Sequence, residues 1–203
     1  MAATVSLPGT AATGPVAVIL TWGWRLAVLT GGWWLQTFAG GVILGIAPAT
    51  LTLYRRMQAA FEDGDDGLRR AWSWWRRDFW DAQLRLGVPG LTVVVLAWYL
   101  QALRGTPFAV TVAVLGVAYL CWLMHMPAAV AVRGTRRPVA ADWRAALVLL
   151  VRRPVPHLLA GLTAAAVIVA LLVWYPGALV IALPALPALL ATLAVRSAYA
   201  TVV

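Results

Sequence analysis

Four long stretches without a charged residue dominate this sequence after Arg25. No Asp, Glu, Lys or Arg occurs within residues 26–54, 86–103, 105–132 and 154–195. A transmembrane helix needs about 20 mostly apolar residues, so the first three stretches each predict one membrane span. The fourth stretch is long enough for two spans, and Trp174-Tyr175-Pro176-Gly177 gives a turn signal near its middle.

The pattern therefore predicts an all-α, polytopic membrane protein, with about five transmembrane helices in a single domain over residues 1–203. The expected spans cover residues 26–46, 84–103, 108–128, 157–174 and 178–196. The apolar segment before Arg25 either lies at the membrane interface or lengthens the first span. Composition agrees, because 63% of residues are hydrophobic and 11% charged, against about 45–50% and about 25% in soluble domains. Such apolar content excludes disorder, and a lone Cys121 excludes a disulfide scaffold.

The positive charge is confined to particular loops. All 16 basic residues are Arg, against 7 acids, which gives a net charge of +9. Most of these Arg fall in the loops 55–85 and 133–153, and Arg196 follows the last span. Five spans place them on one face, with Arg25 and Arg104 opposite. Since positively charged loops stay in the cytoplasm, we expect a multi-pass cell-membrane protein with its amino terminus outside and its carboxyl terminus inside. Short loops between spans also argue against nucleic acid as the partner of this charge.

A patterned segment at about residues 67–82 separates the first two spans. Its apolar residues recur at helical spacing, which predicts an amphipathic helix along the inner leaflet. Acids precede Arg by four residues in Asp65/Arg69, Asp66/Arg70 and Asp81/Arg85, the favourable order on a helix. The residues that we expect to contact a partner or lipid are Trp72, Trp74, Trp75, Arg76, Arg77, Asp78, Phe79 and Trp80.

A weaker version of this amphipathic segment and the spans that follow it recurs later in the sequence. Asp142-Trp143-Arg144-Ala145 opens a second amphipathic helix, which a Pro-containing break separates from the predicted fourth span. Each unit is an amphipathic helix followed by a helical hairpin. An internal parallel repeat and a mere recurrence of hairpins both explain this order, and residue identity does not decide between them.

Two glycines favour close helix packing. Gly41 and Gly45 form a Gly-x-x-x-Gly step in the predicted first span, and small residues let two helices approach closely. The step predicts either a dimer seam or an internal contact.

The titratable residues give little indication of chemistry. None of the acids lies in a predicted span, which disfavours a carrier that relays protons through carboxylates. His125 and His157 lie near span ends, and we expect structural roles for both, since two isolated His make a poor metal site. No hydrolase, phosphate-loop or zinc motif occurs, so we expect neither an enzyme nor a cofactor.

Two motifs resemble the YesL family of bacterial membrane proteins, which is defined by a domain of unknown function. The segment Gly45–Tyr54 contains a Pro-Ala-Thr-x-x-Leu-Tyr pattern, and Asp78-Phe79-Trp80 gives a later Asp-Phe-aromatic pattern. The sequence departs from the family just before the first motif, where Gly41-Val42-Ile43-Leu44-Gly45 replaces the usual Pro and Thr. The motif residues carried over are Pro48, Ala49, Thr50 and Tyr54. The resemblance implies a bacterial inner membrane and an association with carbohydrate uptake systems of the ATP-binding cassette type.

Three functions remain open at this point. The first is a non-enzymatic integral membrane accessory or regulatory protein, with membrane lipids and carbohydrate ABC transporter subunits as its partners. The alternative is a small transporter or channel that moves solute through its own helix bundle. The third is a lipid-binding organiser of the membrane. The sequence identifies neither the solute, nor the partner, nor the oligomeric state.

Overall fold

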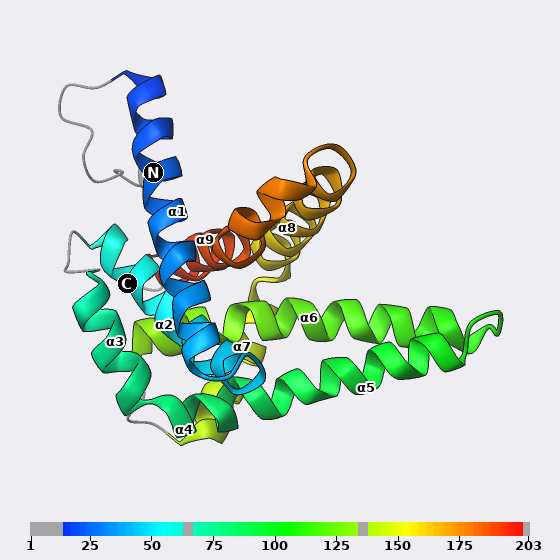
Figure 1. Cartoon of the computed structure of the whole chain (residues 1–203). Coiled ribbons are helices and arrows are strands. Elements are labelled where there is room, and N and C mark those ends of the chain that lie inside the picture. The colour runs from blue at the N-terminus through cyan, green and yellow to red at the C-terminus, as the bar shows by residue number, and fades with distance from the viewer. Residues whose placement is uncertain (1–13, 63–66, 134–137, 201–203) are drawn as a thin grey trace.

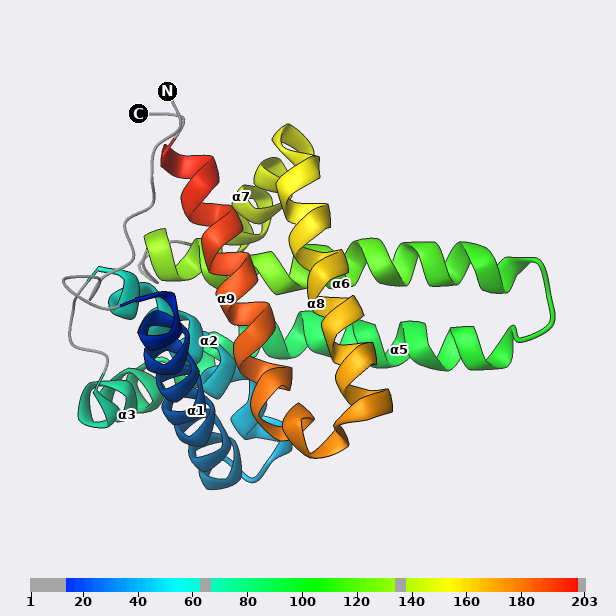
Figure 2. The same cartoon turned by 90° about the horizontal axis from the view of Figure 1, so that it is seen from above.

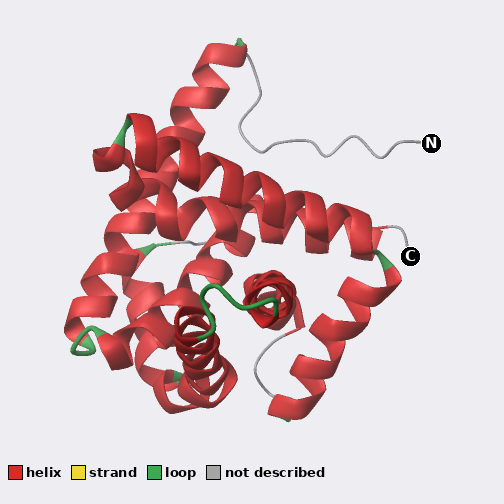
Figure 3. Ribbon diagram, turned by 90° about the vertical axis from the view of Figure 1, so that its right-hand side faces the viewer, coloured by secondary structure: helices red, strands yellow, loops and turns green. Residues whose placement is uncertain are grey.

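The computed structural model describes residues 14–62, 67–133 and 138–200, which are helical along nearly their whole length. The all-α prediction is confirmed for this part of the chain, where Figure 3 shows helices joined by short loops. The elements are α1 (Pro15–Ala39), α2 (Ile43–Phe61), α3 (Leu68–Arg77), α4 (Phe79–Ala82), the π-helical turn η1 (Gln83–Gly87), α5 (Val88–Ala102), α6 (Phe108–Arg133), α7 (Val139–Arg152), α8 (Pro154–Trp174), the 3-10 turn η2 (Pro176–Ala178) and α9 (Leu179–Ala200). The acids of the predicted pairs Asp65/Arg69 and Asp66/Arg70 lie outside the described residues.

Four helices in the described part are long and apolar enough to cross a membrane. They cover Val16–Ala39, Phe79–Ala102, Phe108–Val132 and Pro154–Trp174, and α9 adds a shorter apolar segment, Ala182–Ala198. The last four predicted spans overlap these helices. The turn predicted within residues 174–177 is also present, as η2. The polytopic membrane class is therefore supported by the helices as well as by the sequence.

The predicted first span, residues 26–46, is wrong at both ends. Helix α1 begins at Pro15, so the apolar segment before Arg25 lengthens it, and α1 ends at Ala39. Gly41 (φ 74°) and Val42 (φ 64°) then take left-handed backbone conformations. The amide of Ile43 donates to the Gly41 carbonyl at 2.9 Å, which closes a three-residue γ-turn around Val42. The chain reverses here because glycine stops a helix readily, a signal that outweighs the continuous apolar run.

Helices α1 and α2 form a tight antiparallel hairpin. A Cβ added at Gly45 would lie 2.1 Å from the Thr37 carbonyl oxygen, so only glycine allows this approach. Gly45 thus makes an internal contact. Gly41 lies in the turn, and a Cβ there would meet nothing within 4 Å. The packing role predicted for Gly41 and the dimer seam on one helix are therefore wrong, because the two glycines do not share a helix.

The same hairpin corrects the predicted position of Arg25. Its Nη1 donates to the Ala60 carbonyl at 3.2 Å, and the rings of Trp22 and Phe61 lie 4.9 Å apart. The start of α1 therefore lies beside the end of α2, on the side that carries the first Arg-rich loop. Arg25 does not lie opposite that loop, since α2 returns the chain to the level of Arg25. Arg104 is in the turn between α5 and α6. These two helices form a second hairpin, and the turn lies at its tip, far from the other helices (Figure 1).

Helix α2 occupies the centre of the body. One apolar core joins Leu29 of α1 and Met57 of α2 to Val195 of α9. A second core joins Leu51 of α2 to Leu86 of η1, Met126 and Val130 of α6 and Ala146 of α7. Outside these cores, the α5–α6 hairpin projects away from the body, and the α8–α9 hairpin crosses α6 at a steep angle (Figures 1 and 2). Both predicted units are present as an amphipathic helix followed by a hairpin, although their repeat relationship stays a prediction.

Candidate functional site

Helix α3 is fixed to the body by one apolar face. Ala71 is fully buried and Trp75 is 9% exposed. The Trp75 ring packs against Gly40, stacks on Trp72 at 5.0 Å and meets the edge of Phe79 at 5.1 Å. Trp75 therefore anchors the helix, and it is not available as a contact for a partner.

The opposite face of α3 is cationic. We name the exposed residues Arg69, Arg70, Ser73, Arg76 and Arg77, together with the half-buried Trp74, the α3 surface. The Arg70 guanidinium lies 5.0 Å from the centre of the Trp74 ring, and the Arg76 guanidinium lies 5.8 Å from that of Trp72. Each exposed cation–π contact is worth about 0.5–1 kcal/mol, so the rings favour one placement of these guanidinium groups. Next along the chain, Trp80 of α4 is 74% exposed.

Asp78 lies at the junction of α3 and α4, inside the protein. Its carboxylate pairs with Arg55 of α2 and accepts a hydrogen bond from Arg77 Nε at 3.0 Å. Burial raises the pKa of the Asp78 carboxyl, but the hydrogen bonds from Arg77 and Arg55 outweigh this effect and hold the pKa below its usual range. Asp78 therefore joins α3 to α2 as a structural anion.

A second ion-pair network is buried more deeply. Arg85, which is 1% exposed, lies between two acids. Its Nε contacts Asp81 Oδ2 at 2.5 Å, which confirms the predicted pair four residues apart. Its Nη1 pairs with Asp142 of α7, which is also 1% exposed. The network thus joins the amphipathic helices of the two units through one guanidinium.

The backbone around Arg85 takes part in the same junction. Residues Gln83–Gly87 form a π-helical turn, a rare geometry that is frequent at functional sites. The Arg85 carbonyl accepts a hydrogen bond from Trp143 Nε1 at 3.3 Å. The Trp143 carbonyl in turn accepts one from Trp122 Nε1 of α6, also at 3.3 Å. Side chain and backbone of Arg85 therefore both connect η1 to α7.

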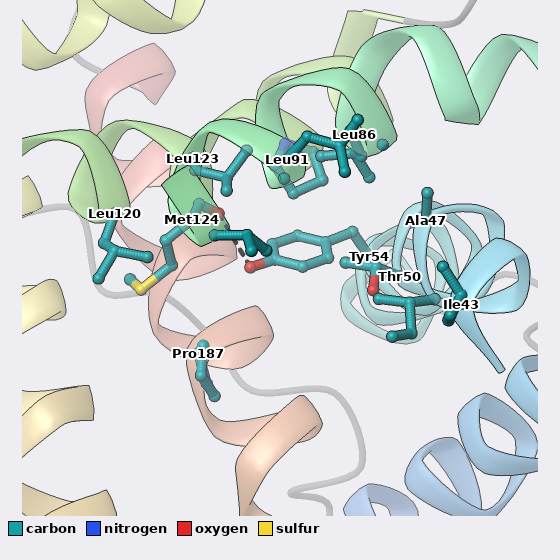
Figure 4. Close-up of a pocket in the computed structure, with 15 residues that line it drawn as sticks. Ile43, Ala47, Thr50, Tyr54, Leu86, Leu91, Leu120, Leu123, Met124 and Pro187 are labelled. Atoms are coloured by element: carbon teal, nitrogen blue, oxygen red, sulfur yellow. Dashed lines mark hydrogen bonds between the residues drawn. The ribbon is translucent and has the colours of Figure 1, made fainter. Parts of the chain in front are cut away.

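The Pro-Ala-Thr motif helix lines a cavity of about 450 Å³ between α2, α5 and α6, and Pro187 of α9 also lines it. Thr50 and Tyr54 supply its polar atoms on the α2 side (Figure 4). Thr50 Oγ1 accepts a hydrogen bond from Trp33 Nε1 at 3.1 Å, and the Tyr54 hydroxyl donates to the Met124 carbonyl at 2.9 Å. Both polar groups are used within the protein, so the cavity presents an apolar lining. The remaining motif residues, Pro48 and Ala49, are buried in α2.

The two histidines are brought together, contrary to the expectation that they are isolated. His125 of α6 and His157 of α8 are buried, with ring centres 4.4 Å apart and planes at 83°. His125 Nδ1 donates to the Cys121 carbonyl at 2.7 Å. Neither His157 ring nitrogen has a hydrogen-bond partner among the described residues. The described residues contain no group of three or more His, Cys, Asp and Glu placed to hold a metal ion.

Sequence reasoning missed two of these arrangements. The spacing of Asp81 and Arg85 revealed one half of the buried network, but Asp142 is too distant in sequence for any local pattern to place it beside Arg85. The His pair depends on α8 crossing α6, where Gly161 allows Cys121 of α6 to approach closely. The available signal was an Arg that follows the first amphipathic segment and an Asp in the first turn of the second.

One family model matches the region that carries the α3 surface and one wall of the cavity. Residues 26–101 match the family model of DUF624, a protein of unknown function. The DUF624 match runs from within α1 to the last turn of α5, so it includes the motif helix α2, Asp78 and Arg85. No curated protein and no solved structure matches the chain.

Proposed function

We propose that this chain is a non-enzymatic integral membrane accessory protein that docks an acidic segment of a partner protein on the α3 surface. The observation that carries the proposal is the fixed presentation of that surface. Trp75 packs against Gly40 in the turn between α1 and α2, and Asp78 pairs with Arg55 of α2. The guanidinium groups of Arg70 and Arg76 rest on tryptophan rings. Little side-chain freedom is then lost when a partner binds.

Charge complementarity defines the partner. Helix α3 contains four Arg and no acid between Leu68 and Arg77. A guanidinium presents a planar array of donors that matches a carboxylate in two-point hydrogen bonds. Acidic side chains of a partner therefore fit this surface. The resemblance to the YesL family, with which the DUF624 match is consistent, points to a subunit of a carbohydrate uptake system of the ATP-binding cassette type.

The proposal also includes a location and an orientation. We place the protein in the cell membrane of a bacterium, with the α3 surface and the end of α9 in the cytoplasm, because Arg-rich loops stay on that side. The expected outside position of the amino terminus rested on Arg25 lying opposite the first loop. Since Arg25 lies beside Ala60, the start of α1 belongs on the cytoplasmic side too.

Site-specific photocrosslinking in native membranes tests the docking. A photoreactive phenylalanine analogue replaces Ser73, which is exposed between Arg70 and Arg76. We expect a crosslink to one membrane-protein subunit, within an acidic peptide that mass spectrometry identifies. The double variant R70Q/R76Q should lose this crosslink. The matched control R152Q/R153Q removes two exposed Arg from the end of α7 and should keep it.

Other outcomes overturn the proposal. Crosslinks to phospholipid alone would make the α3 surface a leaflet anchor and not a protein dock. An equal loss of crosslinks in both double variants would show that net charge matters and not this surface. Sugar or ion flux in proteoliposomes containing the purified chain alone would favour the small transporter or channel, because an accessory protein carries no solute by itself.

A further inference from the structure

We propose that the cavity between α2, α5 and α6 binds one acyl chain of a bilayer phospholipid. This site is separate from the α3 surface and is independent of the proposed docking. At about 450 Å³, the cavity lies within the range of about 300–1,000 Å³ that small-molecule sites occupy. It contains the motif residues Thr50 and Tyr54, to which the proposed docking gives no role.

The chemistry of the lining selects a hydrocarbon. Ala47, Leu86, Leu123 and Pro127 are among the apolar residues that surround the space. Its polar side chains already have partners, since Tyr54 donates to Met124 and Thr50 accepts from Trp33. A buried water needs two to four polar partners, so this lining does not favour water. A hydrocarbon chain instead gains dispersion contacts with every wall.

The mouth of the cavity indicates the source of the chain. The lining residues Ile43, Leu91 and Val94 are 80%, 65% and 65% exposed, so the cavity opens onto an apolar surface. That surface continues along α5 through exposed residues such as Val95 and Trp98. Helix α5 belongs to a segment apolar enough to span a membrane. Lipid tails surround such a segment, and a tail can therefore enter from the side.

Figure 4 shows how the cavity holds its shape. The Tyr54 ring extends from α2 toward Met124, and the hydrogen bond to the Met124 carbonyl joins the two walls. Pro127 lies one turn further along α6 and has no amide hydrogen for the Leu123 carbonyl. The helix α6, which forms one wall, therefore lacks one backbone hydrogen bond at Pro127. The hydrogen bond from Tyr54 connects this wall to α2 across the cavity. A preformed space of this kind favours retention of a bound chain.

Gly90 provides the means to fill the cavity. It lines the space, and a Cβ added there would meet nothing within 4 Å. Gly90→Phe therefore places a ring where the acyl chain would lie without a clash at its first atom. Gly31→Phe is the matched control, because Gly31 is exposed on α1, outside the cavity, and its added Cβ also meets nothing within 4 Å.

The experiment uses the full chain in vesicles of phosphatidylethanolamine and phosphatidylglycerol that contain a phospholipid with a diazirine in its acyl chain. After irradiation and extraction, we expect labelled peptides containing Thr50, Leu91 and Met124. Native mass spectrometry should show one phospholipid retained in detergent by the unmodified protein and by Gly31→Phe. Gly90→Phe should lose both signals.

Two results would overturn the assignment. The first is a photolabel found only on outward residues of the α5–α6 hairpin. The second is a Gly90→Phe variant that retains as much phospholipid and photolabel as the unmodified protein. If Gly90→Phe elutes as unfolded protein, Gly90→Leu replaces it, since the shorter side chain still fills part of the cavity. Undiminished retention in folded Gly90→Leu counts equally against the proposal.

Discussion

Removing Arg85 should destabilise the fold more than any exposed charge change. Arg85→Met leaves the buried carboxylate of Asp142 without its cation, and both groups are only 1% exposed. Breaking a buried pair by removing one partner costs about 3–5 kcal/mol. The Asp81 side chain is 35% exposed, so its separate contribution is at most about 1 kcal/mol. We expect Arg85→Met to lower the free energy of unfolding by about 3–5 kcal/mol.

A double-mutant cycle identifies the origin of this loss. Asp142→Leu together with Arg85→Met leaves no buried charge at the junction, so the double variant should recover most of the stability. Unfolding in mixed micelles, followed by tryptophan fluorescence, provides the measurement. Glu62→Gln is the control, because Glu62 and Arg196 form a 3.6 Å pair whose side chains are 58% and 32% exposed. That change should cost about 0–1 kcal/mol. If Arg85→Met costs no more than Glu62→Gln, the buried network does not stabilise the protein.

Three further perturbations test the local geometry. The pKa of the Asp78 carboxyl is lowered, so its stabilisation is present above the ordinary Asp pKa of about 4 and is lost as the pH falls through the lower folded value. Asp78→Asn should therefore melt at a lower temperature than the unmodified protein at pH 7, and a gap that does not narrow in acid would contradict this reasoning. Val42→Gly should raise the free energy of unfolding by about 1 kcal/mol, because a β-branched residue at φ 64° stores about 1–3 kcal/mol of strain. A lower melting temperature of this variant would show that the contacts of the Val42 side chain stabilise the protein more than the backbone strain destabilises it. Gly45→Ala should cost more than about 2 kcal/mol by chemical unfolding, since its Cβ would lie 2.1 Å from the Thr37 carbonyl oxygen, whereas Gly31→Ala should change stability by at most about 1 kcal/mol.

Charge-free length predicted most helices because it reflects a physical requirement of the bilayer. The stretches that end before Arg104 and Arg133 each gave one helix close to the expected place, and the stretch that ends before Arg196 gave two. The same criterion failed for residues 26–54, since a run without charges contains no information about where it turns. Gly40 and Gly41 were visible as a helix stop, but the apolar run around them favoured a single span.

The candidate site divides in the same way. Helical spacing predicted one amphipathic helix at about residues 67–82, whereas α3 ends at Arg77 and α4 begins at Phe79. The same spacing puts Trp72 and Trp75 on one apolar stripe, and their rings do stack. Spacing also placed Trp75 on the apolar stripe and Trp80 off it, in agreement with their exposure. It did not show that Trp75 is too buried to contact a partner, because that depends on how α3 packs against the rest of the protein. The pairing of Arg85 with Asp142 and the contact of His125 with His157 depend on helix crossings, which a single sequence does not specify.

The order of the acids around Arg85 has a consequence for synthesis. Asp81 precedes Arg85 by four residues, whereas Asp142 follows it by 57 residues. At roughly 5–20 residues per second, the second acid emerges roughly 3–11 s after the arginine. During that interval Asp81, on the same helix, is the one carboxylate of this network available to Arg85. The pair between Arg85 and Asp142 can therefore form only after α7 has been synthesised. The first amphipathic helix and its hairpin complete their packing only when the second amphipathic helix is present.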